Sequence, residues 1–216
     1  MKKSILVIGG IILIGISGLV YLAYRYNYIP HIKYDSAHFG IDTYISDVDY
    51  DGDSIDDQTD ILNGARKYVA TDPKYKSKYY ASGFPDDEYG VCTDVVAFAL
   101  LEAGYNLMEL VNEDIKTHRD DYDIDVIDKN IDFRRVNNLQ EYFSNNAISL
   151  SLDINDIAEW QGGDIVVFDG HIGIVSDKRN YKGIPFVIHL ANPYQASYEE
   201  DILGSYGNIV GHFRIS

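Results

Sequence analysis

Apolar residues along the chain follow three successive patterns. From Ile5 to Tyr24 they form a run that no charged residue interrupts. Residues 25–48 are rich in tyrosine and follow no clear period. Residues 49–216 carry apolar positions first at helical spacing and later in short runs typical of strands. We therefore predict an N-terminal apolar helix, a tether over residues 25–48 and one folded domain over residues 49–216.

The first apolar run is long enough to cross a membrane as a helix. About twenty apolar residues span a bilayer core, and the run exceeds the roughly 7–15 apolar residues of a signal peptide. Lys2 and Lys3 favour a cytoplasmic N-terminus. We predict a signal anchor over residues 1–24, with a transmembrane helix at about 4–24. The protein is then expected in the cell membrane, single-pass, with its domain outside the cytoplasm; a cleaved signal peptide is the alternative.

Within the domain, the apolar period changes from helical to strand-like at Asp164. Thr59 or Asp60 can cap the first helix. The predicted helices cover residues 61–70, 92–103, 107–116 and 139–145. The predicted strands cover residues 164–168, 171–175, 186–190 and 209–215, with a hairpin turn at Asp169-Gly170. This order predicts an α+β fold in which N-terminal helices pack on a C-terminal antiparallel sheet, preceded by the transmembrane helix.

Acidic residues occupy nearly every second position between residues 49 and 60. Such a loop gathers carboxylates around one point, and calcium takes six to eight oxygen ligands in loops of this kind. Counted from the first acid, oxygen donors at the expected positions come from Asp49, Asp51, Asp53, the Ile55 carbonyl, Asp57 and Asp60. The loop departs from the usual pattern because Ser54 stands where glycine is expected. A structural Ca²⁺ site is one interpretation, and a solvated acidic loop is the other.

Charge and cysteine content narrow the classes of function. The chain has a net charge of -16, which argues against a nucleic-acid partner. Its single cysteine, Cys92, excludes an intramolecular disulfide. Cys92 follows a Gly-Pro-Asp-rich loop and begins an apolar helical run, where the positive end of the helix dipole favours a thiolate. A small buried core cysteine is the alternative interpretation.

Two histidines lie on the predicted strands. His171 begins one strand and His189 lies on the next, so their side chains can touch in the right register. Gly173 allows another element, such as the cysteine helix, to approach the sheet closely. A cysteine at a helix start, a histidine on a facing strand and a polar residue that orients the histidine suit nucleophilic thiol catalysis.

These segments resemble a known superfamily. Gly-Asp-Ile-Val-Val-Phe at 163–168, His171-Ile-Gly-Ile-Val and Val-Ile-His189 are similar to NlpC/p60-type cysteine peptidases of the papain-like fold. Gly-Val-Cys92-Thr-Asp94-Val-Val, Asn-Ile-Asp-Phe-Arg-Arg-Val and the final Val-Gly-His-Phe-Arg more closely resemble the bacterial domain of unknown function numbered 1287. The resemblance covers about residues 49–216.

The resemblance implies a cysteine peptidase or amidase that needs no cofactor for catalysis. Cys92 would be the nucleophile, His171 the general base and His189 the orienting residue. Tyr80 could supply a hydroxyl near the oxyanion, and Asp94 could cap its helix or contact substrate. The implied substrates are peptidoglycan peptides, and the membrane is the other expected partner.

Two other classes of function remain open at this point. Cys92, His171 and His189 could instead bind zinc as three protein ligands with an open position, which would give a zinc-dependent hydrolase. The domain could also be a calcium-stabilised binding module without catalytic turnover.

Overall fold

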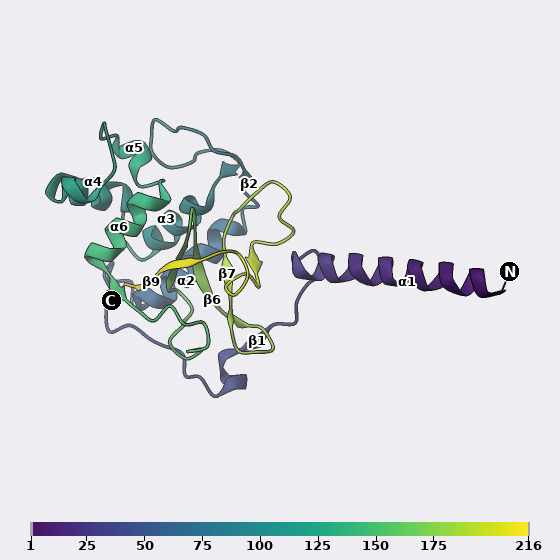
Figure 1. Ribbon diagram of the computed structural model, residues 1–216. Coiled ribbons are helices and arrows are strands. Elements are labelled where there is room, and N and C mark those ends of the chain that lie inside the picture. The colour runs from purple at the N-terminus through teal and green to yellow at the C-terminus, as the bar shows by residue number, and fades with distance from the viewer. Residues whose placement is uncertain (1, 216) are drawn as a thin grey trace.

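The computed structural model describes residues 2–215, and it describes side chains from residue 10 to residue 215. Figure 1 shows a mixed domain of helices and strands from which the first helix projects. The helices are α1 (Lys2–Arg25), α2 (Asp57–Val69), α3 (Cys92–Glu102), α4 (Leu107–Thr117), α5 (Lys129–Asp132) and α6 (Val136–Asn146). Short 3-10 helices cover Ser36–Phe39 and Arg119–Asp121.

The strands form an antiparallel sheet of seven and a separate parallel pair. The sheet contains β1 (Tyr34–Asp35), β4 (Ile148–Ser149), β5 (Ile165–Phe168), β6 (His171–Arg179), β7 (Pro185–Ile188), β8 (Glu199–Glu200) and β9 (Ile209–Arg214). Its order is β4-β9-β5-β6-β7-β8, and β1 pairs with the end of β6. The pair is β2 (Lys74–Tyr75) with β3 (Tyr89–Gly90). The predicted α+β fold with a C-terminal antiparallel sheet is confirmed.

Apolar side chains fill both faces of the sheet. Ile172 and Ile174 of β6 pack in one cluster with α3 residues such as Val96 and Leu100. The alternate residue Val175 packs in a second cluster around Trp160. This alternation follows from the two-residue period of a strand, so α3 covers one face of β6, while His171 and Gly173 belong to the opposite face.

The prediction of a membrane-spanning helix is wrong. A span needs about twenty consecutive apolar residues in one helix. In the part of the chain that the structure describes, no helix has both the length and the apolar character that crossing a bilayer requires. The fold class is corrected accordingly, and the predicted single-pass membrane localisation is contradicted by the same finding.

Part of the 25–48 segment belongs to the folded domain. Tyr34 and Asp35 pair with Arg179 and Lys178 of β6 as strand β1. The Arg179 side chain is fully buried and donates from Nε to the Ser36 hydroxyl at 2.9 Å. A segment expected to act as a tether therefore adds a short strand beside the end of β6.

Two local predictions need correction: the residue that caps α2 and the element that approaches Gly173. Asp56, rather than Thr59 or Asp60, caps α2, because its carboxylate accepts from the Thr59 N–H. Gly173 does allow a close approach, but the approaching element is β7: an added Cβ would lie 2.6 Å from Val187 and 2.9 Å from the Ile188 carbonyl oxygen. The cysteine helix is not among its nearest neighbours.

Candidate active site

The N-terminus of α3 is held in place by a buried ion pair. Asp94 accepts from the Val91 N–H at 2.8 Å, which satisfies one free donor at the helix start. Its two oxygens also accept from Arg134, from Nε at 2.6 Å and from Nη2 at 2.9 Å. Because Asp94 and Arg134 are both buried, this carboxylate positions Cys92 and is fully engaged within the protein.

Cys92 is the first residue of α3 and is partly buried. Burial raises the pKa of its thiol to about 11, although the backbone N–H groups of Ile172 and Thr93 act in the opposite direction. The thiol is therefore protonated at neutral pH. The thiol contacts β6 through the Ile172 backbone N–H, next to His171. Among the described residues, no hydrogen bond joins the sulfur to an imidazole.

The two predicted histidines do meet. The pairing of β6 with β7 aligns Ile174 with Ile188, so residues 173 and 189 face each other. His171 Nε2 lies 3.0 Å from His189 Nδ1. His189 Nε2 lies 3.2 Å from a carboxylate oxygen of Glu200 on β8. The structure thus adds Glu200 to the predicted pair and forms a buried chain of three side chains.

Hydrogen-bond chemistry assigns the protons along this chain. A Glu200 carboxylate only accepts, so His189 Nε2 carries the proton and Nδ1 accepts. His171 Nε2 must then donate, which leaves Nδ1 of His171 as the basic nitrogen. Gln195 Nε2 also lies 3.3 Å from His189 Nε2, but its two protons are directed to the carbonyls of His189 and Ser197.

His171 is a neutral base in this environment. Burial, and then the neighbouring His189, lower its pKa to about 3. The imidazole is therefore unprotonated at neutral pH, and its burial makes it a weaker base than a free imidazole. The free protein holds a neutral thiol and a neutral imidazole rather than a thiolate–imidazolium pair.

Tyr206 packs on His171 and lines an open cavity next to this chain. Its ring stacks on His171 with centroids 4.4 Å apart, and its pKa is raised by burial and then by the nearby Cys92 thiol. It also lines a cavity of about 580 Å³ together with His189, Gln195 and Glu200. Cys92 and His171 do not line this cavity.

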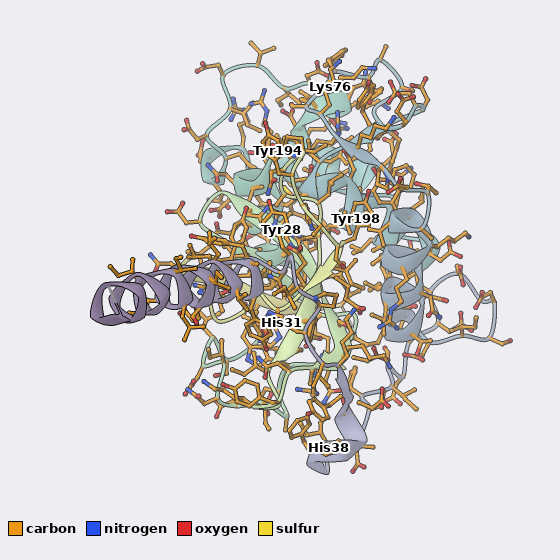
Figure 2. All side chains as sticks on the ribbon, turned by 90° about the vertical axis from the view of Figure 1, so that its right-hand side faces the viewer. Tyr28, His31, His38, Lys76, Tyr194 and Tyr198 are labelled. Atoms are coloured by element: carbon orange, nitrogen blue, oxygen red, sulfur yellow. The ribbon has the colours of Figure 1, made fainter. Side chains whose placement is uncertain are left out.

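The cavity has a second wall from the start of the chain. Residues 25–28 line it, and the Tyr28 hydroxyl donates to the Tyr194 carbonyl at 3.1 Å. Figure 2 shows Tyr28, His31 and Tyr194 near the point where α1 meets the domain. Sequence reasoning missed Tyr206, Gln195 and Glu200, because β8 and the loops around it are too short to give a periodic signal.

Tyr80 does not contact this group. Its hydroxyl donates to Asp87 at 2.7 Å within its own loop, and its ring lies under the Arg134 guanidinium, 5.0 Å from centroid to Cζ. Burial and the Asp87 carboxylate raise its pKa. Tyr80 thus packs against Arg134 of the Asp94–Arg134 pair.

The candidate metal ligands fall into two groups. Asp49, Asp51 and Asp53 bring oxygens within 4.8 Å of one another, and in the described part of the chain they are the only such group. Cys92, His171 and His189 do not meet that spacing, so the geometry does not favour the zinc alternative. The predicted ligand Asp57 is instead engaged within the protein, because its carboxylate accepts from the Tyr50 N–H and the Tyr105 hydroxyl.

The remaining predicted ligands differ in exposure. Ile55 is exposed, and its N–H donates to Asp53 at 2.8 Å. Asp60 lies in the first turn of α2 and is buried, with 4% of its surface exposed.

The protein is an α+β domain that has one cysteine at the start of a helix and a buried chain of His171, His189 and Glu200. Residues 62–215 match the family described as a domain of unknown function, DUF1287, and the chain belongs to this family. It is similar to "Uncharacterized protein YijF" of Escherichia coli (strain K12), with 36% identity over 167 residues that cover 71% of this chain and 80% of that protein. No solved structure matches the chain.

Proposed function

We propose that this protein is a cysteine hydrolase that cleaves amide bonds, related to NlpC/p60-type peptidases. The observation that carries the proposal is the Glu200–His189–His171 chain, which leaves a neutral, basic nitrogen on the strand contacted by the thiol-bearing helix. A nucleophile, a base and a group that orients the base are the parts that covalent catalysis requires.

The proposed reaction uses these residues in order. His171 takes the Cys92 proton through Nδ1 as the sulfur attacks the carbonyl carbon, and backbone N–H groups at the start of α3 stabilise the oxyanion. The C–N bond then breaks as His171 returns the proton to the leaving amine. Water, deprotonated by His171, cleaves the thioester and releases the acid and the free thiol.

The proposed reaction requires the thiol and the imidazole to approach each other, because α3 covers one face of β6 and His171 belongs to the opposite face in the resting structure. A hydrogen bond between nucleophile and base is often long in a free enzyme and tightens only when substrate binds. Movement of Tyr206, which stacks on His171 and lines the cavity, would connect the cavity with the thiol. Peptidoglycan stem peptides or crosslinks are the proposed substrates, and this part rests on the resemblance alone.

The experiment is mass spectrometry of muropeptides incubated with the wild type and with Cys92→Ala. We expect new peptide termini with the wild type and a loss of more than about a thousandfold in the variant. The variant should unfold at nearly the wild-type temperature, which separates a catalytic defect from a folding defect. Equal product formation by both proteins would rule out the proposed nucleophile.

The raised thiol pKa favours a second candidate, a binding module without turnover. Alkylation by iodoacetamide separates the two. A catalytic Cys92 should react slowly at pH 7, react faster as pH rises towards 11, and slow further in His171→Gln at pH 7. A thiol whose reactivity ignores His171 at every pH would favour the binding module.

A further inference from the structure

The cavity of about 580 Å³ beside the buried histidine chain has walls that hydrogen bonds hold in place. His31 lies 2.9 Å from a carboxylate oxygen of Asp201 and 2.8 Å from the Tyr24 carbonyl oxygen, so it joins the end of α1 to the domain. The Tyr28 hydroxyl donates to the Tyr194 carbonyl, and Figure 2 shows both tyrosines on the face from which α1 projects. Ligand sites are usually formed in this way before the ligand binds.

Tyrosine rings supply much of the apolar surface of this cavity. Four tyrosines line it: Tyr26, Tyr28, Tyr194 and Tyr206. All four are exposed, and Tyr194 exposes 79% of its surface. Exposed apolar groups gathered in one place are typical of a ligand site. A tyrosine ring has a flat apolar face and a polar hydroxyl, so a suitable ligand carries both apolar C–H groups and polar groups.

The same cavity contains hydrogen-bonding groups that the described chain leaves without partners. The Glu200 side chain is only 8% exposed, yet its Oε1 atom accepts no hydrogen bond from a described residue. Asn27 Oδ1 accepts from the Asp201 N–H, and Asn192 Oδ1 accepts from the Tyr194 N–H. These bonds orient both amides and leave each Nδ2 group available. A buried acceptor without a partner is costly, so a ligand that donates to Glu200 would be favoured.

This combination of groups favours an uncharged ligand that both donates and accepts. An anionic ligand would meet the Glu200 carboxylate, whereas a cationic ligand would leave the amide Nδ2 groups and the Arg25 guanidinium without acceptors. Arg25 makes no ion pair with a described residue, and its hydrogen bond to the Ser205 carbonyl is long, at 3.4 Å. A hydroxyl group donates and accepts at the same time, so neighbouring hydroxyls can satisfy the carboxylate and the amides together.

We propose that this cavity binds a neutral saccharide of one or two rings. Its C–H faces would pack on the exposed tyrosines, while its hydroxyls donate to Glu200 and accept from Asn27, Asn192 and Arg25. The cavity volume lies within the range of about 300–1,000 Å³ that is usual for small-molecule sites. Binding does not depend on the proposed hydrolase activity, because Cys92 does not line the cavity.

Saturation-transfer difference NMR of the full chain tests the site with cellobiose and di-N-acetylchitobiose as probes. We expect transfer to the ring C–H protons of at least one of these sugars. Tyr194→Ala should weaken its binding about three- to tenfold, because it removes a stacking face. Asn192→Asp keeps the acceptor for the Tyr194 N–H but removes the donor, and should weaken binding by about the same factor. Tyr79→Ala removes an exposed tyrosine outside the cavity and should bind as the wild type does.

Charged probes and one further variant complete the test. Cadaverine, a diamine, and glutarate, a dicarboxylate, should bind more weakly than the sugar. Cys92→Ala should bind the sugar as the wild type does, so loss of hydrolysis and loss of sugar binding are separate results. Tyr194→Ala removes only an exposed ring and keeps the comparison valid if Asn192→Asp does not fold. Absence of transfer to both sugars at about 10 mM, wild-type affinity in Tyr194→Ala, or tighter binding of a charged probe would overturn the proposal.

Discussion

At the residue scale, burial sets the chemistry of the candidate site. Cys92 begins a helix, a position that favours the thiolate, yet burial dominates and raises its pKa to about 11. Burial also keeps His171 neutral by lowering its pKa to about 3. Both effects favour uncharged groups, so in the proposed reaction proton transfer would accompany attack rather than precede it.

The lowered pKa of His171 makes stability depend on pH. An unfolded histidine takes up a proton near pH 6.5, whereas the folded His171 does not. Its contribution is complete above pH 6.5 and is lost as pH falls towards 3. Between pH 7 and pH 5, the wild type should lose about 2 kcal/mol of unfolding free energy that His171→Gln does not lose. Urea denaturation at the two pH values measures this difference.

His38→Gln serves as the control, because His38 is exposed. This variant should lose stability in parallel with the wild type between pH 7 and pH 5. Parallel losses in His171→Gln as well would show that His171 titrates normally in the folded protein.

At the element scale, one ion pair fixes the start of α3. Asp94 joins the Val91 N–H to Arg134, whose Nη1 also donates to the Lys78 carbonyl at 2.6 Å. Arg134 lies in the connection from α5 to α6, so the pair links the start of α3 to this connection and to the loop of Lys78. The position of Cys92 relative to β6 depends on this linkage.

Asp94→Asn should destabilise the protein by about 3–5 kcal/mol, because it leaves the Arg134 charge buried and unpaired. The matched control is Glu102→Gln on the same helix, which breaks the more exposed pair with Lys67 and should cost less than about 1 kcal/mol. Guanidinium denaturation followed by circular dichroism measures both. Similar losses in the two variants would contradict the structural role of Asp94.

At the scale of the whole molecule, the segment before the domain completes the sheet. Arg179 is buried and donates to Ser36 and to the carbonyls of Ile157, Gly183 and Trp160. Burial lowers its pKa to about 10. The Tyr44 ring lies 4.3 Å from the Arg214 guanidinium. The folded unit therefore begins before residue 49.

Two shortened chains test this boundary. A chain over residues 30–216 should unfold near the wild-type temperature, whereas one over residues 49–216 should unfold several degrees lower. The shorter chain loses β1 and leaves the charged Arg179 without its Ser36 partner, a loss of about 1.5–3 kcal/mol. Differential scanning calorimetry compares them. Equal unfolding temperatures would restrict the folded unit to residues 49–216.

Short-range sequence patterns alone were sufficient to predict several helices and strands of this protein. The helix at Cys92, the hairpin at Asp169-Gly170 and the strands on either side of it were predictable, because period and turn chemistry are properties of neighbouring residues. The same pattern that indicated the two histidines also placed them on adjacent strands, where the structure brings them into contact. The prediction of a membrane span, by contrast, rested on the length of one apolar run and was wrong.

Only the tertiary structure decided which residues complete the site. Glu200 and Tyr206 reach His189 and His171 from segments too short to carry a period, and β9 inserts beside β5 rather than following β8. Asp57 and Asp60 look equivalent in the sequence, yet Asp57 accepts from the Tyr105 hydroxyl, whereas Oδ2 of Asp60 is buried with no hydrogen-bond partner among the described residues. Such differences depend on what lies across space from a side chain, and the order of residues along one chain does not specify that.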